Sequence, residues 1–158
     1  MTAYILSVWL HVLLACVWVG GLIYTAAVVV PFAVKHPPAE RQRILRGLAR
    51  KFRMIGWTSV VLLIITGFYN ATQRYAVEGP GALFDKTRVG FWLPRKLELF
   101  TLMVLLMLFH DITSMRAAKK YEGSPESAPG NRLGSIAAAI ATLLALGVLY
   151  CSVHLVRG

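Results

Sequence analysis

Residues 4–34 read YILSVWLHVLLACVWVGGLIYTAAVVVPFAV, and this stretch of 31 residues contains no Lys, Arg, Asp or Glu. A helix rises about 1.5 Å per residue, so the stretch can cross the roughly 30 Å of hydrocarbon in a bilayer. It is too long for the apolar segment of a signal peptide, and no basic region precedes it. We therefore interpret it as a retained membrane-spanning helix that is kinked or ended near Pro31.

Three further apolar stretches, at about 55–71, 91–115 and 136–156, are also suited to crossing a membrane. Hydrophobic residues make up 57% of the 158 residues and charged residues only 15%, with a mean hydropathy of +0.62. A soluble domain carries about 25% charged residues, so this composition excludes an ordinary soluble protein. The sequence predicts an all-α, integral membrane four-helix bundle, with residues 1–158 forming one transmembrane domain in the lipid bilayer of the cell (inner) membrane.

The net charge of +10 does not indicate nucleic-acid binding, because the basic residues lie in segments that connect the apolar stretches. Eleven of the seventeen Lys and Arg residues follow the first and third spans, and six lie on the other side. Positive charge is concentrated on the cytoplasmic side of membrane proteins, so we expect both termini outside. The eleven are Lys35, Arg41, Arg43, Arg46, Arg50, Lys51, Arg53, Arg116, Lys119, Lys120 and Arg132.

The basic segment 35–53 has the pattern of an amphipathic helix. Ile44, Leu45, Leu48 and Phe52 share one face, and the other face is rich in arginine. Such a helix typically lies at the membrane surface on anionic lipid. We prefer this interpretation to a protein-binding element.

Three ionisable side chains fall at similar depth in three different spans, and such residues inside a bilayer are candidates for function. His11 lies roughly 10 Å below the outer surface and His154 roughly 5 Å, with Lys96 at a similar outer depth. Helix bundles build cofactor sites from inward-facing side chains of this kind. The alternative is that each histidine only bonds a neighbouring helix and that Lys96 extends to the surface. His110 lies roughly 20 Å deeper than Lys96 and is not expected to join them.

Two further sets of residues suggest two different cofactors, haem and copper. Arg74, Arg88 and Arg95 gather at the outer interface, where they could pair with haem propionates or with lipid phosphates. Met103, Met107 and His110 share one face of the third span and form a soft-ligand set suited to Cu(I). Methionine on an apolar helix is more often a core residue, and we favour that interpretation of the stripe.

The segments WLHVLLACVWVGGLIY (9–24) and RMIGWTSVVLLIITGFYN (53–70) resemble the first and second spans of CopD-like copper-resistance proteins. The first segment also resembles HemJ-type protoporphyrinogen oxidases. So does LPRKLELFTLMVLLMLFHD (93–111), where Lys96 opens the helix and His110 lies near its far end. The chain departs from the HemJ pattern in having Val-Gly-Gly after Trp18 and His-Asp at 110–111.

The resemblance implies either a haem b held by His11 with a lysine or histidine partner, or a role in copper uptake. Our main hypothesis is a b-type haem protein with His11 and either Lys96 or His154 as axial ligands, and Arg74 and Arg95 near the propionates. With both axial positions filled, its role is one-electron transfer with the quinone pool or another redox partner. The first alternative is copper uptake or binding, and the second is protoporphyrinogen oxidation. The sequence therefore does not decide whether the protein is an oxidoreductase.

Overall fold

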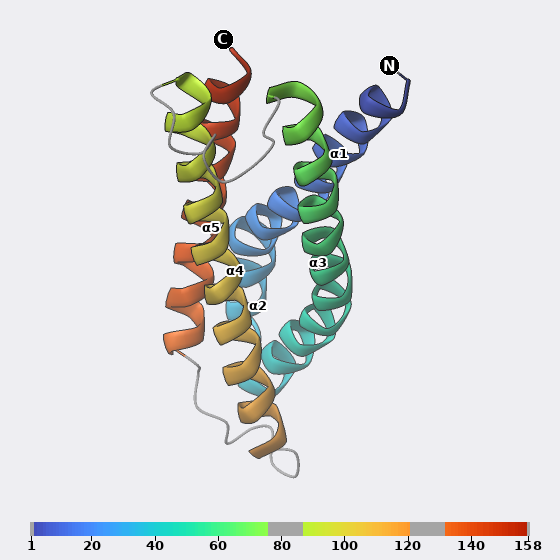
Figure 1. Cartoon of the computed structure of the whole chain (residues 1–158). Helices are drawn as coiled ribbons and strands as arrows, with labels where there is room; N and C mark the ends of the chain where they lie inside the picture. Colours follow the sequence, from blue (N-terminus) through green and yellow to red (C-terminus); the bar gives the residue numbers. More distant parts are fainter. Residues whose placement is uncertain (1, 76–86, 121–131, 158) are drawn as a thin grey trace.

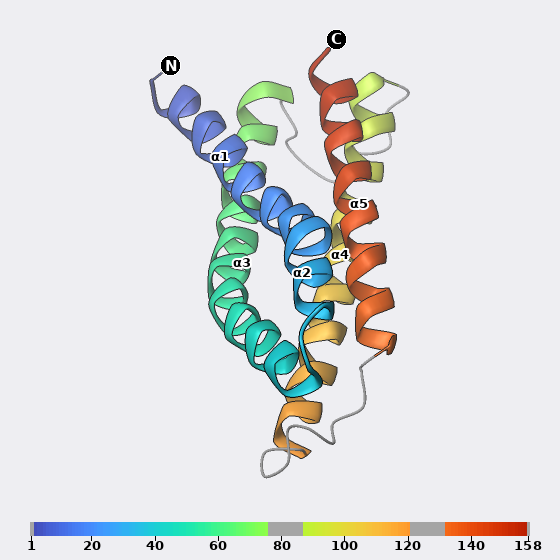
Figure 2. The same ribbon diagram turned by 180° about the vertical axis from the view of Figure 1, so that it is seen from behind.

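The computed structural model describes residues 2–75, 87–120 and 132–157, and these residues are almost entirely helical (Figure 1). The elements are α1 (Thr2–Tyr24), the π-helix η1 (Thr25–Val29), α2 (Val30–Val34), α3 (Pro38–Tyr75), α4 (Arg88–Lys120) and α5 (Arg132–Val156). Four stretches are long and apolar enough to cross a membrane: Thr2–Val34, Pro38–Arg74, Arg88–Ala117 and Ser135–Val156. The predicted all-α protein with four spans is therefore confirmed. Both chain ends lie at the same end of the molecule, which we call the termini end (Figures 1 and 2).

The first span changes its helical repeat shortly before Pro31, where the sequence predicts a kink or an end of the helix. Residues Thr25–Val29 form a π-helix, and Pro31 follows in the first turn of α2. Proline has no N–H to donate and its ring collides with the carbonyl one turn back, so a wider turn before it relieves the collision. The span thus continues through Pro31 to Val34, and the chain then turns at residues 35–37 into α3.

The basic segment and the second span form one helix, α3, of 38 residues. This continuity differs from the expected surface helix on lipid, because part of the apolar face is turned toward the protein. Phe52 packs directly against Gly21 of α1, where a Cβ atom would overlap the phenyl ring. The arginines on the opposite face, among them Arg43 and Arg46, are exposed.

The helices associate as two pairs, α1 with α3 and α4 with α5, and α1 also contacts α5. The two views show α1 crossing α3 at a steep angle, with α4 and α5 running side by side (Figures 1 and 2). Small residues allow the close approach of α5, since a Cβ on Gly147 would meet Leu99 at 3.3 Å. One buried cluster joins all four spans and consists of Trp18, Val19, Val60, Leu63, Met103, Ala141 and Ala145.

Large apolar side chains cover the outside of the bundle. Phe68 is 74% exposed, Met54 73% and Leu143 68%. In water such a surface would be a large apolar patch, whereas in a bilayer it faces lipid tails of the same polarity. The bundle is therefore built for a lipid surrounding, and its few polar side chains in the spans need partners within the protein.

Candidate functional site

His11 of α1 is held by a hydrogen bond to α3. Its Nδ1 lies 2.7 Å from the Oγ1 of Thr66, and the same hydroxyl donates its proton to the carbonyl of Leu62, also at 2.7 Å. A hydroxyl has only one proton, so Thr66 must accept from His11 and the imidazole must carry its proton on Nδ1. The lone pair of Nε2 is then left for another partner. This arrangement is the one that orients a histidine as a metal ligand.

Gly67 gives the imidazole room beside α3. A Cβ atom at Gly67 would lie 3.1 Å from the Cε1 of His11, so even an alanine here would press on the ring. Thr66 and Gly67 together therefore fix both the orientation and the height of the imidazole. Sequence analysis singled out His11 but did not identify Thr66, whose only signal was a hydroxyl at similar depth in the second span.

Lys96 of α4 comes close enough to His11 for the two groups to interact electrostatically. It also interacts with the thiol of Cys151 on α5, which is buried with 4% of its surface exposed. The structure thus brings groups from α1, α4 and α5 together near the termini end. Sequence analysis did not connect Cys151 with Lys96, because spacing along one helix does not reveal which way each residue faces.

His154 lies in a different environment from His11. Its ring stacks on Trp92 of α4 at a centroid distance of 4.5 Å and an interplanar angle of 12°. Tyr150 packs edge-on against the same ring, also at 4.5 Å. The contacts of His154 are therefore aromatic contacts within the α4–α5 pair, and the structure gives it no contact with His11.

The arginines considered for haem propionates lie at the surface. The guanidinium of Arg95 sits 3.6 Å above the ring of Phe91 and donates to the Phe91 carbonyl at 2.8 Å. Arg74 is exposed in the last turn of α3. Arg88 donates to the carbonyl of His154 at 2.9 Å and so fastens the end of α5. Two of these three arginines are thus engaged by backbone carbonyls in this structure.

Met103 and Met107 of the third span face the interior. Met103 is 1% exposed and belongs to the buried cluster, and Met107 is half-buried against it. The methyl group of Met107 and the indole nitrogen of Trp18 both approach Gly56, at 3.9 and 3.7 Å from a Cβ placed there. The two thioethers therefore occupy the centre of the bundle, below His11 and Lys96.

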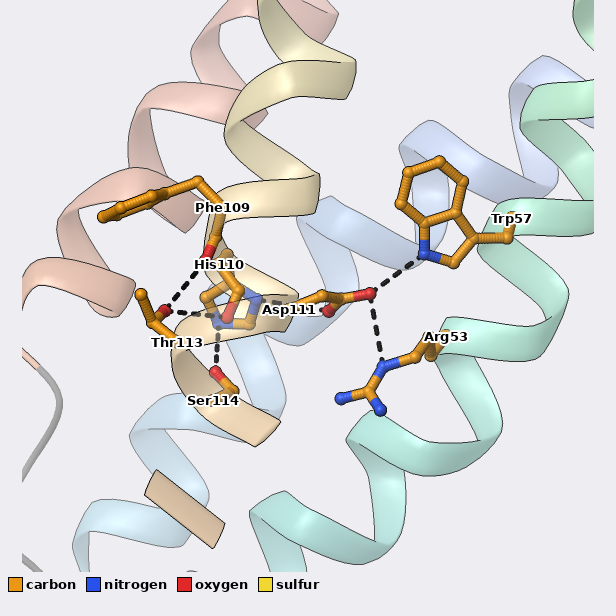
Figure 3. A network of polar contacts seen from close by, with 7 residues as sticks. All are labelled: Arg53, Trp57, Phe109, His110, Asp111, Thr113 and Ser114. Atoms are coloured by element: carbon orange, nitrogen blue, oxygen red, sulfur yellow. Dashed lines mark hydrogen bonds and ion pairs between the residues drawn. The ribbon is translucent and has the colours of Figure 1, made fainter. Parts of the chain in front are cut away.

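A polar network follows Met107 along α4, away from the termini end, and Figure 3 shows its side chains. Asp111 of α4 accepts a hydrogen bond from the Trp57 indole of α3 at 2.9 Å, and the Nε of Arg53 forms an ion pair with the same oxygen at 3.2 Å. His110 Nδ1 lies 3.6 Å from the other carboxylate oxygen, and its Nε2 lies 3.5 Å from the hydroxyl of Ser114. The network joins the α1–α3 pair to the α4–α5 pair.

His110 therefore faces Asp111 and Ser114 as well as sharing a helix with the methionines. Arg53 and Trp57 were not predicted as its neighbours. They are one turn apart on α3, and Asp111 is an acid within an apolar stretch that needs such partners. The sequence alone does not give the rotation of α3 about its axis, and this rotation decides whether Arg53 points inward.

Along α4 these groups form one line. Asp111 lies 15 positions after Lys96, or about 22 Å along the helix, with Met103 and Met107 between them. In the part of the chain that the structure describes, no three His, Cys, Asp or Glu residues gather as a metal cluster. The candidate site is thus a row of polar and sulfur-containing side chains, with the two thioethers at its centre.

These features define a multi-pass membrane protein whose interior holds imidazole, thiol and thioether groups. The sequence model of CopD, Copper resistance protein D, matches residues 46–155, and the chain belongs to this family. This confirms the CopD-like resemblance. An uncharacterized protein of Aquifex aeolicus (strain VF5) is 31% identical over 114 residues, which cover 72% of this chain and 71% of that protein. No solved structure matches the chain.

Proposed function

We propose that the protein binds Cu(I) inside its membrane-spanning bundle and passes the ion along the inner face of α4, as a copper-handling protein of the cell inner membrane. The observation that carries the proposal is the position of Met103 and Met107, one turn apart in the interior between the polar groups at the two ends. Membership of the copper-resistance D family supports copper as the cargo.

The ligand chemistry favours Cu(I) over harder ions. Thioether and imidazole are soft or intermediate ligands that suit Cu(I), whereas Mg²⁺ and Ca²⁺ prefer oxygen. The free Nε2 of His11 offers a ligand above the methionines, and the imidazole of His110, which also faces Asp111 and Ser114, lies below them. Neutral sulfur ligands at the centre let the ion stay bound without water in the middle of the membrane. The path therefore has imidazole at its two ends and soft thioethers at its centre.

Copper binding can be tested on the purified full-length protein under reducing conditions, with a chromophoric chelator competing for Cu(I). We expect wild-type protein to bind Cu(I) and Met103→Leu/Met107→Leu to lose most of this binding. Leu for Met nearly conserves volume, so stability should change by less than about 1.5 kcal/mol per site. Met54→Leu/Met115→Leu is the matched control, because both residues are exposed to lipid, at 73% and 55%.

The control variant should bind copper as the wild type does. The proposal fails if the wild type binds no Cu(I), or if the inner and outer methionine pairs give the same affinity. In the second case the copper is held by groups elsewhere, and Met103 and Met107 are core packing only.

A second candidate is a b-type haem held by His11, and one observation favours it. The hydrogen bond to Thr66 fixes the proton on Nδ1 and leaves Nε2 as a ligand, while Lys96 offers an amine from another helix. These two residues would hold the haem in preference to His154, whose ring is stacked on Trp92. Bound haem would supply one-electron chemistry, with a quinone or a redox protein as partner.

The visible spectrum separates the two candidates. A Soret band in the purified protein that disappears in His11→Ala would select haem, whereas a colourless protein that binds Cu(I) would select copper. Thr66→Val should weaken whichever ligand His11 binds by about 10- to 100-fold, since losing the group that orients a metal-bound histidine has this effect. Thr66→Ser keeps the hydroxyl and serves as the control.

A further inference from the structure

Gly47 of α3 lies at the centre of four exposed cations. Arg43, Arg50 and Lys51 lie three or four residues from Gly47 and so border it on the helix surface, and Arg46 directly precedes it in the chain. A Cβ atom at Gly47 would meet nothing within 4 Å, so the space between the cations is open. Within the described residues none of the four takes part in an ion pair. We call this group the Gly47 cradle.

The depth of the cradle follows from the charges on α3. Residues 54–73 contain no charged side chain, and these 20 residues extend about 30 Å, the thickness of the hydrocarbon layer. Arg53 therefore marks the boundary of the hydrocarbon. Gly47 is six residues further along, or about 9 Å, which is the region of the lipid phosphates.

The same side of α3 continues as an apolar stripe. Met54, Val61 and Phe68 follow Gly47 at intervals of seven residues, so they lie on nearly the same face, and they are 73%, 53% and 74% exposed. A shallow apolar groove of about 290 Å³ between α1 and α3 begins at this level. It is lined by Leu14, Val17, Met54, Ile55, Thr58 and Ser59.

We propose that the Gly47 cradle binds the phosphodiester headgroup of an anionic phospholipid, with an acyl chain lying along the stripe and groove above it. The arginine fork matches phosphate oxygens, and the missing side chain at Gly47 lets a phosphate approach the helix between the forks. Four like charges around one position repel each other, and a bound anion relieves this repulsion. A cation cluster continuous with an apolar face fits a lipid better than a nucleic acid or an acidic peptide, which have no tail to bury. This inference does not depend on the proposed copper function.

The test measures lipid preference around the full-length protein in phosphatidylcholine vesicles. Spin-labelled phosphatidylglycerol and spin-labelled phosphatidylcholine are compared by their motionally restricted fractions in electron paramagnetic resonance. Arg46→Gln/Arg50→Gln should lower the preference for phosphatidylglycerol by about fivefold for each cation removed. Arg116→Gln/Lys119→Gln is the matched control, since it removes the same charge from exposed positions at the end of α4.

Gly47→Glu provides a second variant that should fold, because glutamate favours a helix more than glycine does. It places a carboxylate between the cations and should abolish the preference, while Gly47→Ala should keep most of it. The proposal is overturned if the control pair reduces the preference as much as the cradle pair, which would indicate a general charge effect. It is also overturned if Gly47→Glu has no effect, or if the wild type shows no preference for phosphatidylglycerol.

Discussion

Replacing Asp111 tests whether the polar network fastens the two helix pairs together. Asp111→Ala removes the acceptor of the Trp57 indole and the partner of Arg53, which lie 2.9 and 3.2 Å from the same oxygen. An interhelical hydrogen bond in a membrane protein contributes about 0.6 kcal/mol on average and up to about 1.7. Leaving a fully buried charge unpaired costs about 3–5 kcal/mol. Because the Arg53 side chain is 30% exposed, we expect its unpaired charge to cost only about 1–2 kcal/mol. The total predicted loss is about 2–3 kcal/mol.

The free energy of unfolding can be measured by titrating the protein with dodecyl sulfate in mixed micelles and following its helical circular dichroism. Asp111→Asn keeps an acceptor for Trp57 and should lose only about 1–2 kcal/mol. Glu98→Ala is the control, since this acid is exposed on the same helix, and should stay within about 0.5 kcal/mol. A double-mutant cycle between Arg53→Met and Asp111→Asn should give a coupling of about 1 kcal/mol. A coupling near zero would refute the fastening role.

Two further predictions concern orientation and packing. Eleven Lys and Arg residues lie on one side and six on the other, which places the first side in the cytoplasm. In intact cells Ala39→Cys should therefore resist membrane-impermeant thiol reagents, whereas Thr87→Cys should react. The reverse labelling would show the opposite topology. Gly21→Ala should destabilise the protein by about 1–3 kcal/mol in the same unfolding assay, because its Cβ would overlap Phe52, whereas Gly20→Ala meets no atom within 4 Å and should be neutral or stabilising. Equal effects of the two alanines would contradict the close contact of α1 and α3.

The spans could be predicted from sequence because hydrocarbon imposes one simple rule, a long stretch without charge. The disturbance near Pro31 was predictable for a similarly local reason, the missing N–H and the bulky ring. The length of α3 was not predictable. The apolar stretch 55–71 gives the part in lipid, but nothing in the basic segment before it states whether the chain bends at the surface or continues straight.

The depth of the candidate site residues in the membrane could be predicted from sequence, but the direction in which each side chain points could not. Counting residues places His11, Lys96 and His154 at similar heights, yet the structure brings Lys96 within electrostatic range of His11 and stacks His154 on Trp92. The difference lies in the rotation of each helix about its axis, which depends on packing across the whole bundle. The inner network was missed for the same reason, since Arg53 looks like one more cytoplasmic cation until α3 is rotated to face Asp111.

The contact between Gly21 and Phe52 also gives α1 a fulcrum. The two helices meet again nearer the termini end, where His11 of α1 bonds Thr66 of α3. His11 is ten residues from this contact, a lever arm of about 15 Å, so turning α1 by about 4° moves the imidazole by about 1 Å. That displacement is enough to break a hydrogen bond of 2.7 Å. The bond between His11 and Thr66 therefore reports the angle between two helices, and any ligand that needs the imidazole in place selects one angle.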